Sequence, residues 1–289
     1  MYAAVEQLVL GSGNSVSQVC QTLSVSRSGF YAWRSAAETA REQRDAELTP
    51  LVSEIFWKHK RRYGARRIAV ELSERGERCG VVRVAKLLER QSLQAIQPKS
   101  YRPRTTDARH GLGYSPNLLS GRESPKRMNT VWVGDITYVP LTSAGFGYLS
   151  LLMDLYSRRI VGWEFSESMT DSLVLSALRS AIERRQPPSG LIHHSDRGSQ
   201  YASSRYRQVL RRASMRQSMS AAGNCYDNAF MESCFGTLKS ELEMAEYRDR
   251  MEAIRELSEY VRYYNVDRRH SSLGYLTPSS FESQSIVRK

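Results

Sequence analysis

The sequence predicts an α/β domain in its second half, built on a mixed five-stranded sheet with helices on both faces, preceded by an all-α region. Two observations lead to this prediction. From residue 131 onward, short apolar runs alternate with amphipathic stretches, whereas before residue 97 the apolar residues recur only at helical spacing. Between the two patterns, prolines and glycines interrupt residues 97–129, which we expect to be a basic linker able to lie along DNA.

Composition sets the broad class of protein. The 289 residues are 40% hydrophobic, enough for a sizeable core, and 42 Lys and Arg against 30 Asp and Glu give a net charge of +12. Residues 1–110 hold 19 basic and 11 acidic side chains, so most of the excess lies there. A basic N-terminal part indicates a polyanionic partner, usually nucleic acid, although a basic solvated surface with no specific partner has the same composition.

The cysteines and the lack of long apolar runs indicate the compartment. Cys20, Cys79, Cys225 and Cys234 form no CxxC pair and no finger-like pattern with histidine, so we expect no structural zinc site. They are most simply free thiols in a reducing compartment. The sequence has no run of 18 apolar residues and no signal peptide. We therefore expect a cytoplasmic, nucleoid-associated protein with no membrane partner.

Residues 1–42 are predicted to form an N-terminal helical segment. Apolar residues recur in it at helical spacing: Val16, Val19, Cys20 and Leu23. Residues 24–26 break this pattern, and a second helix with a basic face follows from Arg27 to Arg34. Helix, tight turn and basic helix are typical of a helix-turn-helix, so Arg27 and Arg34 are candidate DNA contacts. A plain helical hairpin is the alternative.

Residues 43–96 are predicted to form a second helix-turn-helix-like domain. It begins with an amphipathic helix over 45–62, and its last helix covers 81–91. The expected core stripe of that last helix is Val81, Val84, Ala85 and Leu88. Its other face carries three candidate DNA contacts: Arg83, Lys86 and Arg90. A solvated basic face is the alternative interpretation.

Residues 130–289 are predicted to form the catalytic core. Three strands come first, 131–140, 148–154 and 159–165, with connections short enough for an antiparallel meander. The expected elements that follow are a helix at 171–185, a strand at 191–195, a helix at 203–213, a strand at 216–219, helices at 226–244 and 249–264, and a C-terminal helix and tail. This order is consistent with the ribonuclease-H-like fold, in which the central strand and the fourth strand are neighbours and the ends of both can face one helix.

Three acids in this order predict a metal site. Asp135 lies within an apolar strand, Asp196 follows the strand at 191–195, and Glu232 lies in the predicted helix 226–244. Burying an unpaired carboxylate is costly, and a shared divalent metal site would account for it. Hard oxygen ligands suit Mg²⁺, and two such ions can hold the attacking and leaving oxygens of a phosphoryl displacement. Lys239, two turns after Glu232, is either a phosphate contact or a surface lysine.

Nearby polar residues are given lesser roles. Asp154 ends a strand and is expected to be a turn or salt-bridge residue. His193 and His194 should point to opposite faces of their strand, because side chains alternate along a strand. Asn224 precedes the helix that carries Glu232 and is a candidate substrate contact, whereas Asp227 is expected to cap that helix.

At these residues the chain resembles bacterial insertion-sequence transposases of the insertion-sequence-three family, within the DDE transposase and retroviral-integrase superfamily. The matching stretches are Trp132–Tyr138, His194–Tyr201, Ser218–Ser233, Tyr264–Pro278 and, in the helical region, Tyr63–Ile68. Together they extend over nearly the whole chain. Thirty-five residues between Asp196 and Glu232, with Lys239 seven residues further on, make this a specific match.

The resemblance implies that Asp135, Asp196 and Glu232 are the catalytic metal ligands and that the cofactor is Mg²⁺ or Mn²⁺, with two ions per active site. It implies cleavage at insertion-sequence ends followed by strand transfer of a 3′-hydroxyl. The implied partner is double-stranded DNA, both terminal repeats and target, on which a homo-oligomer is expected. In this family an upstream reading frame supplies a helix-turn-helix and a leucine zipper. This chain has no heptad run, so it resembles the downstream product, with the upstream protein as a candidate partner.

Two other functions share parts of this pattern. A DNA-binding regulatory subunit, catalytically silent alone, would bind DNA with a steep salt dependence and would not cleave it. A ribonuclease-H-type nuclease would share the carboxylate site and degrade RNA–DNA hybrids without strand transfer. The presence of all three acids argues against the first, and the flanking helix-turn-helix regions argue against the second.

Overall fold

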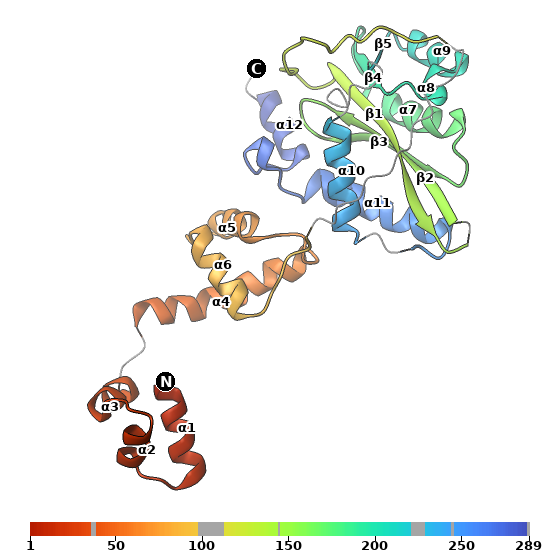
Figure 1. Cartoon of the computed structure of the whole chain (residues 1–289). Coiled ribbons are helices and arrows are strands. Elements are labelled where there is room, and N and C mark those ends of the chain that lie inside the picture. The colour runs from red at the N-terminus through yellow and green to blue at the C-terminus, as the bar shows by residue number, and fades with distance from the viewer. Residues whose placement is uncertain (36–38, 98–112, 144, 221–228, 244–245, 288–289) are drawn as a thin grey trace.

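Two helical units precede an α/β domain in the computed structural model of the chain (Figure 1). The structure describes residues 1–35, 39–97, 113–143, 145–220, 229–243 and 246–287. None of the described helices is long and apolar enough to span a membrane. Within the same residues Cys20, Cys79 and Cys234 are free thiols, and Cys225 lies outside them.

The first unit consists of α1 (Tyr2–Ser12), α2 (Val16–Thr22) and α3 (Arg27–Ser35), so the predicted helix, turn and helix are confirmed with one further helix before them. A capping box starts α2: the Ser15 hydroxyl accepts from the Gln18 amide, and the Gln18 side chain accepts from the Ser15 amide. A small apolar core joins the three helices: Val5, Val19, Cys20 and Phe30.

The second unit consists of α4 (Ala40–Lys58), α5 (Ala65–Glu74) and α6 (Val81–Arg90). Its core is larger and includes Leu48, Val52, Ile55, Phe56, Tyr63, Ile68, Leu72, Val84, Leu87 and Leu88. The predicted core stripe of α6 was wrong at two positions, because Val81 and Ala85 are exposed. A face centred on Val84, Leu87 and Leu88 buries more apolar surface than one that includes an alanine.

The α/β domain is built on five strands: β1 (Val131–Leu141), β2 (Gly145–Asp154), β3 (Ile160–Ser166), β4 (Ile192–Ser195) and β5 (Arg216–Met219). Their order is β3-β2-β1-β4-β5. The first three strands are antiparallel, and β4 and β5 run parallel to β1. The predicted meander is confirmed, and so is the predicted pairing of the central strand, which is β1, with the fourth strand.

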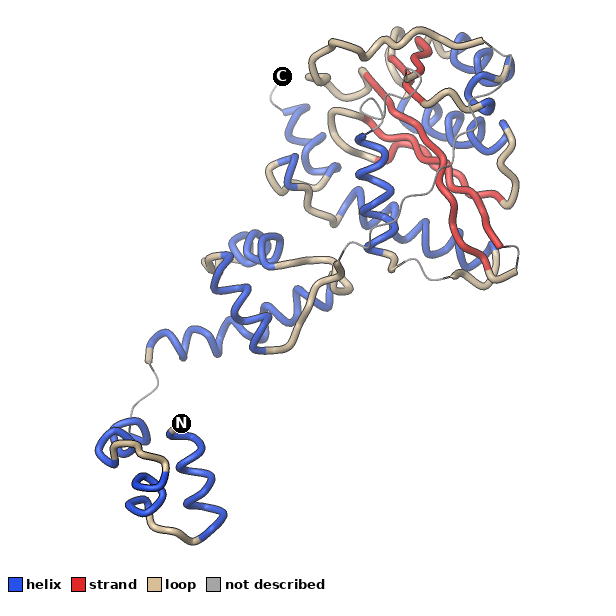
Figure 2. Tube along the Cα trace, viewed as in Figure 1, coloured by secondary structure: helices blue, strands red, loops and turns tan. Residues whose placement is uncertain are grey.

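Helices cover both faces of this sheet (Figure 2). One face packs against α7 (Asp171–Arg185), α8 (Ser199–Ala202) and α9 (Ser204–Arg212). The other packs against α10 (Ala229–Glu241) and α11 (Arg250–Val266). A 3₁₀ helix (Ser271–Leu273) and α12 (Pro278–Val287) follow. Alternation along β1 separates the two cores: Trp132 belongs to the first, and Val131 and Val133 belong to the second.

Candidate active site

The strands β1 and β4 bring Asp135 and Asp196 together. The two strands are parallel, with Val131 opposite Ile192 and Val133 opposite His194. Continuing this register by two residues sets Asp135 opposite Asp196, just beyond the end of β4. Because side chains alternate, Asp135 shares a face with Val133, which packs against α10. The two carboxylates thus lie on neighbouring parallel strands, Asp135 within β1 and Asp196 directly after β4, on the face covered by α10.

Backbone amides orient both carboxylates. Asp135 Oδ1 accepts from the Ile136 amide at 2.8 Å, and Asp196 Oδ1 accepts from the Gly198 amide at 2.9 Å. Glycines allow the close packing around them. A Cβ atom at Gly198 would lie 3.0 Å from Asp196 Oδ1, and one at Gly134 would lie 3.0 Å from His193 Nε2. The two acids are therefore held by tightly packed backbone.

Two neighbouring side chains sense these acids electrostatically. Burial raises the pKa of the Tyr201 phenol well above its usual value, and electrostatic interactions with Tyr206 and with the carboxylates of Asp135 and Asp196 raise it further. On α10, burial lowers the pKa of Lys239, and the Asp135 carboxylate opposes this effect. Lys239 therefore lies within electrostatic range of Asp135.

Glu232 lies in the first turn of α10, and its side chain is exposed. Among the residues that the structure describes, no three His, Cys, Asp or Glu side chains lie close enough together to hold a metal ion. The structure thus brings Asp135 and Asp196 together but does not close Glu232 on them. The two strand acids still offer hard oxygen donors, the ligand type that suits a divalent cation such as Mg²⁺.

The candidate DNA contacts divide into two groups. Arg27, Arg34 and Lys86 are exposed, although Arg34 Nε lies 3.6 Å from Glu6 Oε1. Arg83 and Arg90 instead bind Asp45 on α4, with Arg83 Nε 2.6 Å from Asp45 Oδ1 and Arg90 Nη1 2.8 Å from Asp45 Oδ2. These hydrogen bonds, that from Arg83 first, lower the pKa of Asp45.

The two arginines therefore fasten α6 to α4, a role that their spacing along the helix did not indicate. Asn224, the remaining candidate contact, lies outside the described residues, as does Asp227.

The lesser polar residues occupy structural positions. The buried Asp154 carboxylate accepts from the amides of Asn129, Tyr156 and Ser157, which confirms the predicted turn role. Burial raises its pKa, against these hydrogen bonds.

The two histidines of β4 have different partners, as alternation predicts. His193 Nε2 pairs with Tyr206 Oη at 2.9 Å, and His194 Nδ1 pairs with Ser218 Oγ at 2.8 Å.

One feature of α10 was not found by sequence reasoning: its last residue, Glu241, is buried in an ionic network. Arg268 Nε lies 2.9 and 3.0 Å from the two carboxylate oxygens, and Tyr260 Oη donates to Oε2 at 3.0 Å. Although burial lowers the pKa of Arg268, the Glu241 carboxylate raises it beyond its usual value.

The second helical unit joins this network. Arg67 Nη1 on α5 lies 3.4 Å from Glu241 Oε1, and Arg62 Nε donates to the Glu241 carbonyl at 3.1 Å. Tyr63 Oη also donates to the Asp267 carbonyl and accepts from the Arg269 amide. The helix that carries Glu232 is thus attached at its far end to the second helix-turn-helix unit.

A mixed sheet in this order, with one acid within β1, another directly after β4 and helical units before it, defines an integrase-type core with DNA-binding helix-turn-helix regions. Family comparisons agree. The integrase core domain matches residues 125–225, and a second family of that description matches 213–278. An HTH-like domain matches 42–101, and a family described as transposase matches 2–56.

Individual relatives identify the family. The chain is 41% identical to the "insertion element IS600 uncharacterized 31 kDa protein" of Shigella sonnei, over 92% of this chain and 98% of that protein. It is 40% identical to the transposase InsF for insertion sequence IS3A of Escherichia coli (strain K12), over 94% of this chain and 96% of that protein. The chain belongs to the IS3 family of insertion-sequence transposases.

Two solved structures are more distantly similar. The simian T-cell lymphotropic virus intasome, in complex with PP2A regulatory subunit B56 gamma, is 16% identical with a TM-score of 0.47, covering 80% of this chain and 74% of that one. The HTLV-2 integrase catalytic core domain, in complex with magnesium, is 15% identical with a TM-score of 0.43, covering 54% of this chain and 98% of that one.

Proposed function

We propose that this transposase cleaves DNA at the ends of its insertion sequence and transfers the resulting 3′-hydroxyl ends to target DNA, with Asp135, Asp196 and Glu232 as ligands of two Mg²⁺ or Mn²⁺ ions. One observation carries the proposal: Asp135, within β1, and Asp196, directly after β4, lie on neighbouring parallel strands, on the face covered by the helix of Glu232. Closure of Glu232 on this pair completes the proposed site.

The protein groups have distinct parts in this mechanism. The amides of Ile136 and Gly198 hold the two strand carboxylates in fixed orientations. Lys239, facing Asp135 from α10, supplies a cation for a phosphate of the scissile strand. When bound, the metal ions supply Lewis-acid stabilisation of the charge that develops during an in-line phosphoryl displacement. No side chain of the site has to act as a covalent nucleophile.

The two helical units supply the proposed DNA-binding residues. Arg27 and Arg34 on α3 and Lys86 on α6 are exposed cations on the last helix of each unit, and helix-turn-helix proteins read DNA with such a helix. Arg83 and Arg90 hold α6 in place and add positive charge to the same unit. Asn224 is retained as a proposed substrate contact. We further propose a homo-oligomer on DNA, with the upstream reading-frame protein as a second partner.

Single substitutions test the assignment. Asp135→Ala, Asp196→Ala and Glu232→Ala should each reduce metal-dependent joining of terminal-repeat oligonucleotides by at least about 10²-fold, the scale of losing one electrostatic element of a catalytic site. Duplex binding measured in EDTA should be retained. Glu259→Ala, an exposed acid on α11, is the matched control and should join normally. Normal joining by any one of the three variants would refute its assignment as a ligand.

A regulatory, DNA-binding role is the second candidate, favoured by the lack of a three-acid cluster among the described residues. The same joining assay, run with and without the upstream reading-frame protein, separates the two roles. Duplex binding without joining in both conditions, with Mg²⁺ and with Mn²⁺, would support the regulatory role. Joining under either condition supports the transferase.

A further inference from the structure

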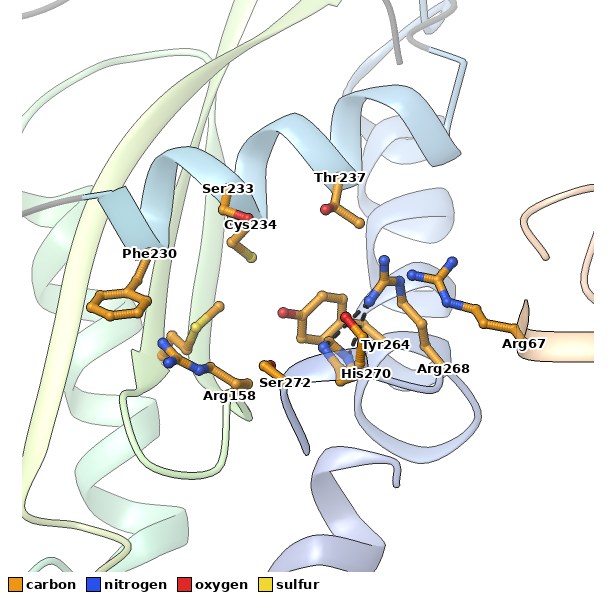
Figure 3. A pocket seen from close by; sticks show the side chains of 12 residues that line it. Arg67, Arg158, Phe230, Ser233, Cys234, Thr237, Tyr264, Arg268, His270 and Ser272 are labelled. Carbon is orange, nitrogen blue, oxygen red and sulfur yellow. Dashed lines mark hydrogen bonds between the residues drawn. The ribbon is translucent and has the colours of Figure 1, made fainter. Parts of the chain in front are cut away.

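A basic pocket of about 460 Å³ lies on the flank of α10 away from Glu232. Phe230, Ser233 and Thr237 line it, at i, i+3 and i+7, whereas Glu232 and Lys239 share a different helix face. Arg67, Arg158 and Arg268 also line the pocket, and none of its described lining residues is acidic. Figure 3 shows Arg158 beside Phe230 at one end and Arg67 and Arg268 toward the other.

The three arginines differ in their partners. Arg268 is paired with Glu241, and Arg67 donates to Glu241 and to the Arg62 carbonyl. Arg158 Nη1 is buried and has no hydrogen-bond partner among the described residues. Its guanidinium lies 4.0 Å from the centre of the Phe230 ring, and burial lowers its pKa. An arginine still carries its charge, so this buried donor lacks the acceptor that it needs.

The backbone holds Arg158 in a particular orientation. Its φ is 59°, in the left-handed region that non-glycine residues rarely adopt. The turn is fixed by Asp154, whose carbonyl accepts from the Arg158 amide at 2.9 Å and whose carboxylate accepts from the amides of Tyr156 and Ser157. A strained residue held by its surroundings is often found at a functional site, so this geometry agrees with a binding role.

The lining indicates which ligand the pocket takes. Hydroxyl groups of Ser233, Thr237, Ser271 and Ser272 surround the arginines. A guanidinium fork matches the oxygens of a phosphate, and hydroxyls donate to the same group. Seated on the flank of α10 away from Glu232, such a phosphate would belong to DNA other than the segment at the carboxylates.

We propose that this pocket binds a backbone phosphate of DNA, held by Arg158 and the surrounding hydroxyls, on a segment distinct from the one that Glu232 and Lys239 address. This inference rests on the proposed function only in taking DNA as the substrate, and it requires neither metal nor strand transfer. Free inorganic phosphate offers the same chemistry, so the experiment has one arm for each source.

The first arm measures the salt dependence of duplex binding by the full chain in EDTA. Arg158→Gln removes the charge but keeps a polar, shorter side chain. The slope of log K against log salt should become shallower by about 0.9, the contribution of one phosphate contact. Arg184→Gln, an exposed arginine on α7, is the matched control for charge and should leave the slope unchanged.

The second arm measures the melting temperature of the same proteins with inorganic phosphate against chloride at equal ionic strength. Phosphate should stabilise the wild type and Arg184→Gln, but not Arg158→Gln. Ser272→Asp, at an exposed position that lines the pocket, adds a competing carboxylate while keeping Arg158. Ser272→Asp should show the shallower salt slope and lack stabilisation by phosphate, as Arg158→Gln does. Agreement between the two variants would show that the result does not come from misfolding of Arg158→Gln.

Loss of both effects in the two pocket variants supports the proposal. A phosphate effect with an unchanged DNA slope would overturn the DNA assignment and leave a site for free phosphate. If neither effect differs from the control, the pocket is not a phosphate site. Both arms omit metal, so they test the phosphate pocket independently of strand transfer. A chain that does not join DNA can still show both effects, and a chain that joins DNA can still lack them.

Discussion

The strand side and the helix side of the proposed active site are built in different ways. Asp135 and Asp196 stand on neighbouring parallel strands of one sheet, whose backbones lie about 4.8 Å apart where they pair. Glu232 stands on a helix that is held by side chains, through an apolar face on the sheet and through Glu241 at its far end. The backbone therefore fixes Asp135 and Asp196, whereas the position of Glu232 depends on side-chain contacts, some of them with the second helix-turn-helix unit.

Removing Glu241 should break the helix side with the largest effect on stability. Glu241→Ala leaves the buried Arg268 without its carboxylate, and breaking a buried ion pair in this way costs about 3–5 kcal/mol. Urea denaturation measures the loss. Glu243→Ala removes a solvent-exposed acid 3.7 Å from Arg61 and should cost less than about 1 kcal/mol. Equal stabilities for the two variants would mean that the ion pair between Glu241 and Arg268 contributes little to the free energy of unfolding.

Acidification should lower the free energy of unfolding, because His193 on β4 and His270 beside Arg268 are both buried in the folded chain. Burial, together with the charge of His194, lowers the pKa of His193 to about 3, and burial with the charges of Arg268 and Arg67 lowers that of His270 to about 3. Both are neutral when folded, whereas the unfolded chain takes up protons below about 6.5. Stability is therefore retained above that pH and falls as the pH decreases from about 6.5 toward 3.

The size of this effect can be checked with single variants. At one pH unit below 6.5, each histidine should cost about 1.4 kcal/mol relative to neutral pH. The free energy of unfolding, measured from pH 7.5 down to 5.5, should fall less steeply for His270→Gln than for the wild type. Identical slopes would show that His270 is not held neutral in the folded chain.

The smallest expected effect comes from Lys239, the residue of α10 that lies within electrostatic range of Asp135. Lys239→Gln removes the cation that faces Asp135, so the salt slope of duplex binding should become shallower by about 0.9 with little change in stability. Joining activity should also fall. Lys126→Gln, at an exposed lysine paired with Glu123, is the control. An unchanged slope in Lys239→Gln would leave Lys239 as a surface lysine rather than a phosphate contact.

Local patterns predicted the elements well. The apolar run from 131 gave a strand that is one residue longer in the structure, and the predicted helix 171–185 is α7 itself. Asp135 could be singled out from the sequence, because burying an unpaired carboxylate in the middle of an apolar strand costs free energy and therefore indicates a functional role. The parallel register that sets it opposite Asp196 followed from strand order, although not residue by residue.

Long-range pairs could not be predicted, because periodicity reports only which face is buried. Arg83 and Arg90 looked like a DNA-facing stripe, yet their partner Asp45 lies 38 and 45 residues away in sequence. Likewise, no local pattern joins Glu241 to Arg268. On α6, Val84 and Leu88 fit more than one helical stripe, and the predicted stripe extended to Val81 and Ala85, whereas the structure buries Leu87.

Gly134 precedes Asp135, and the space where its Cβ would lie is 3.0 Å from His193 Nε2. His193 belongs to β4, three residues before Asp196, and its imidazole is already held by Tyr206. A methyl group at position 134 would therefore push on the neighbouring strand as well as on its own. Glycine at position 134 therefore keeps room for the His193 imidazole beside the strand that carries Asp135, so a larger residue there would be felt on the neighbouring strand that leads to Asp196.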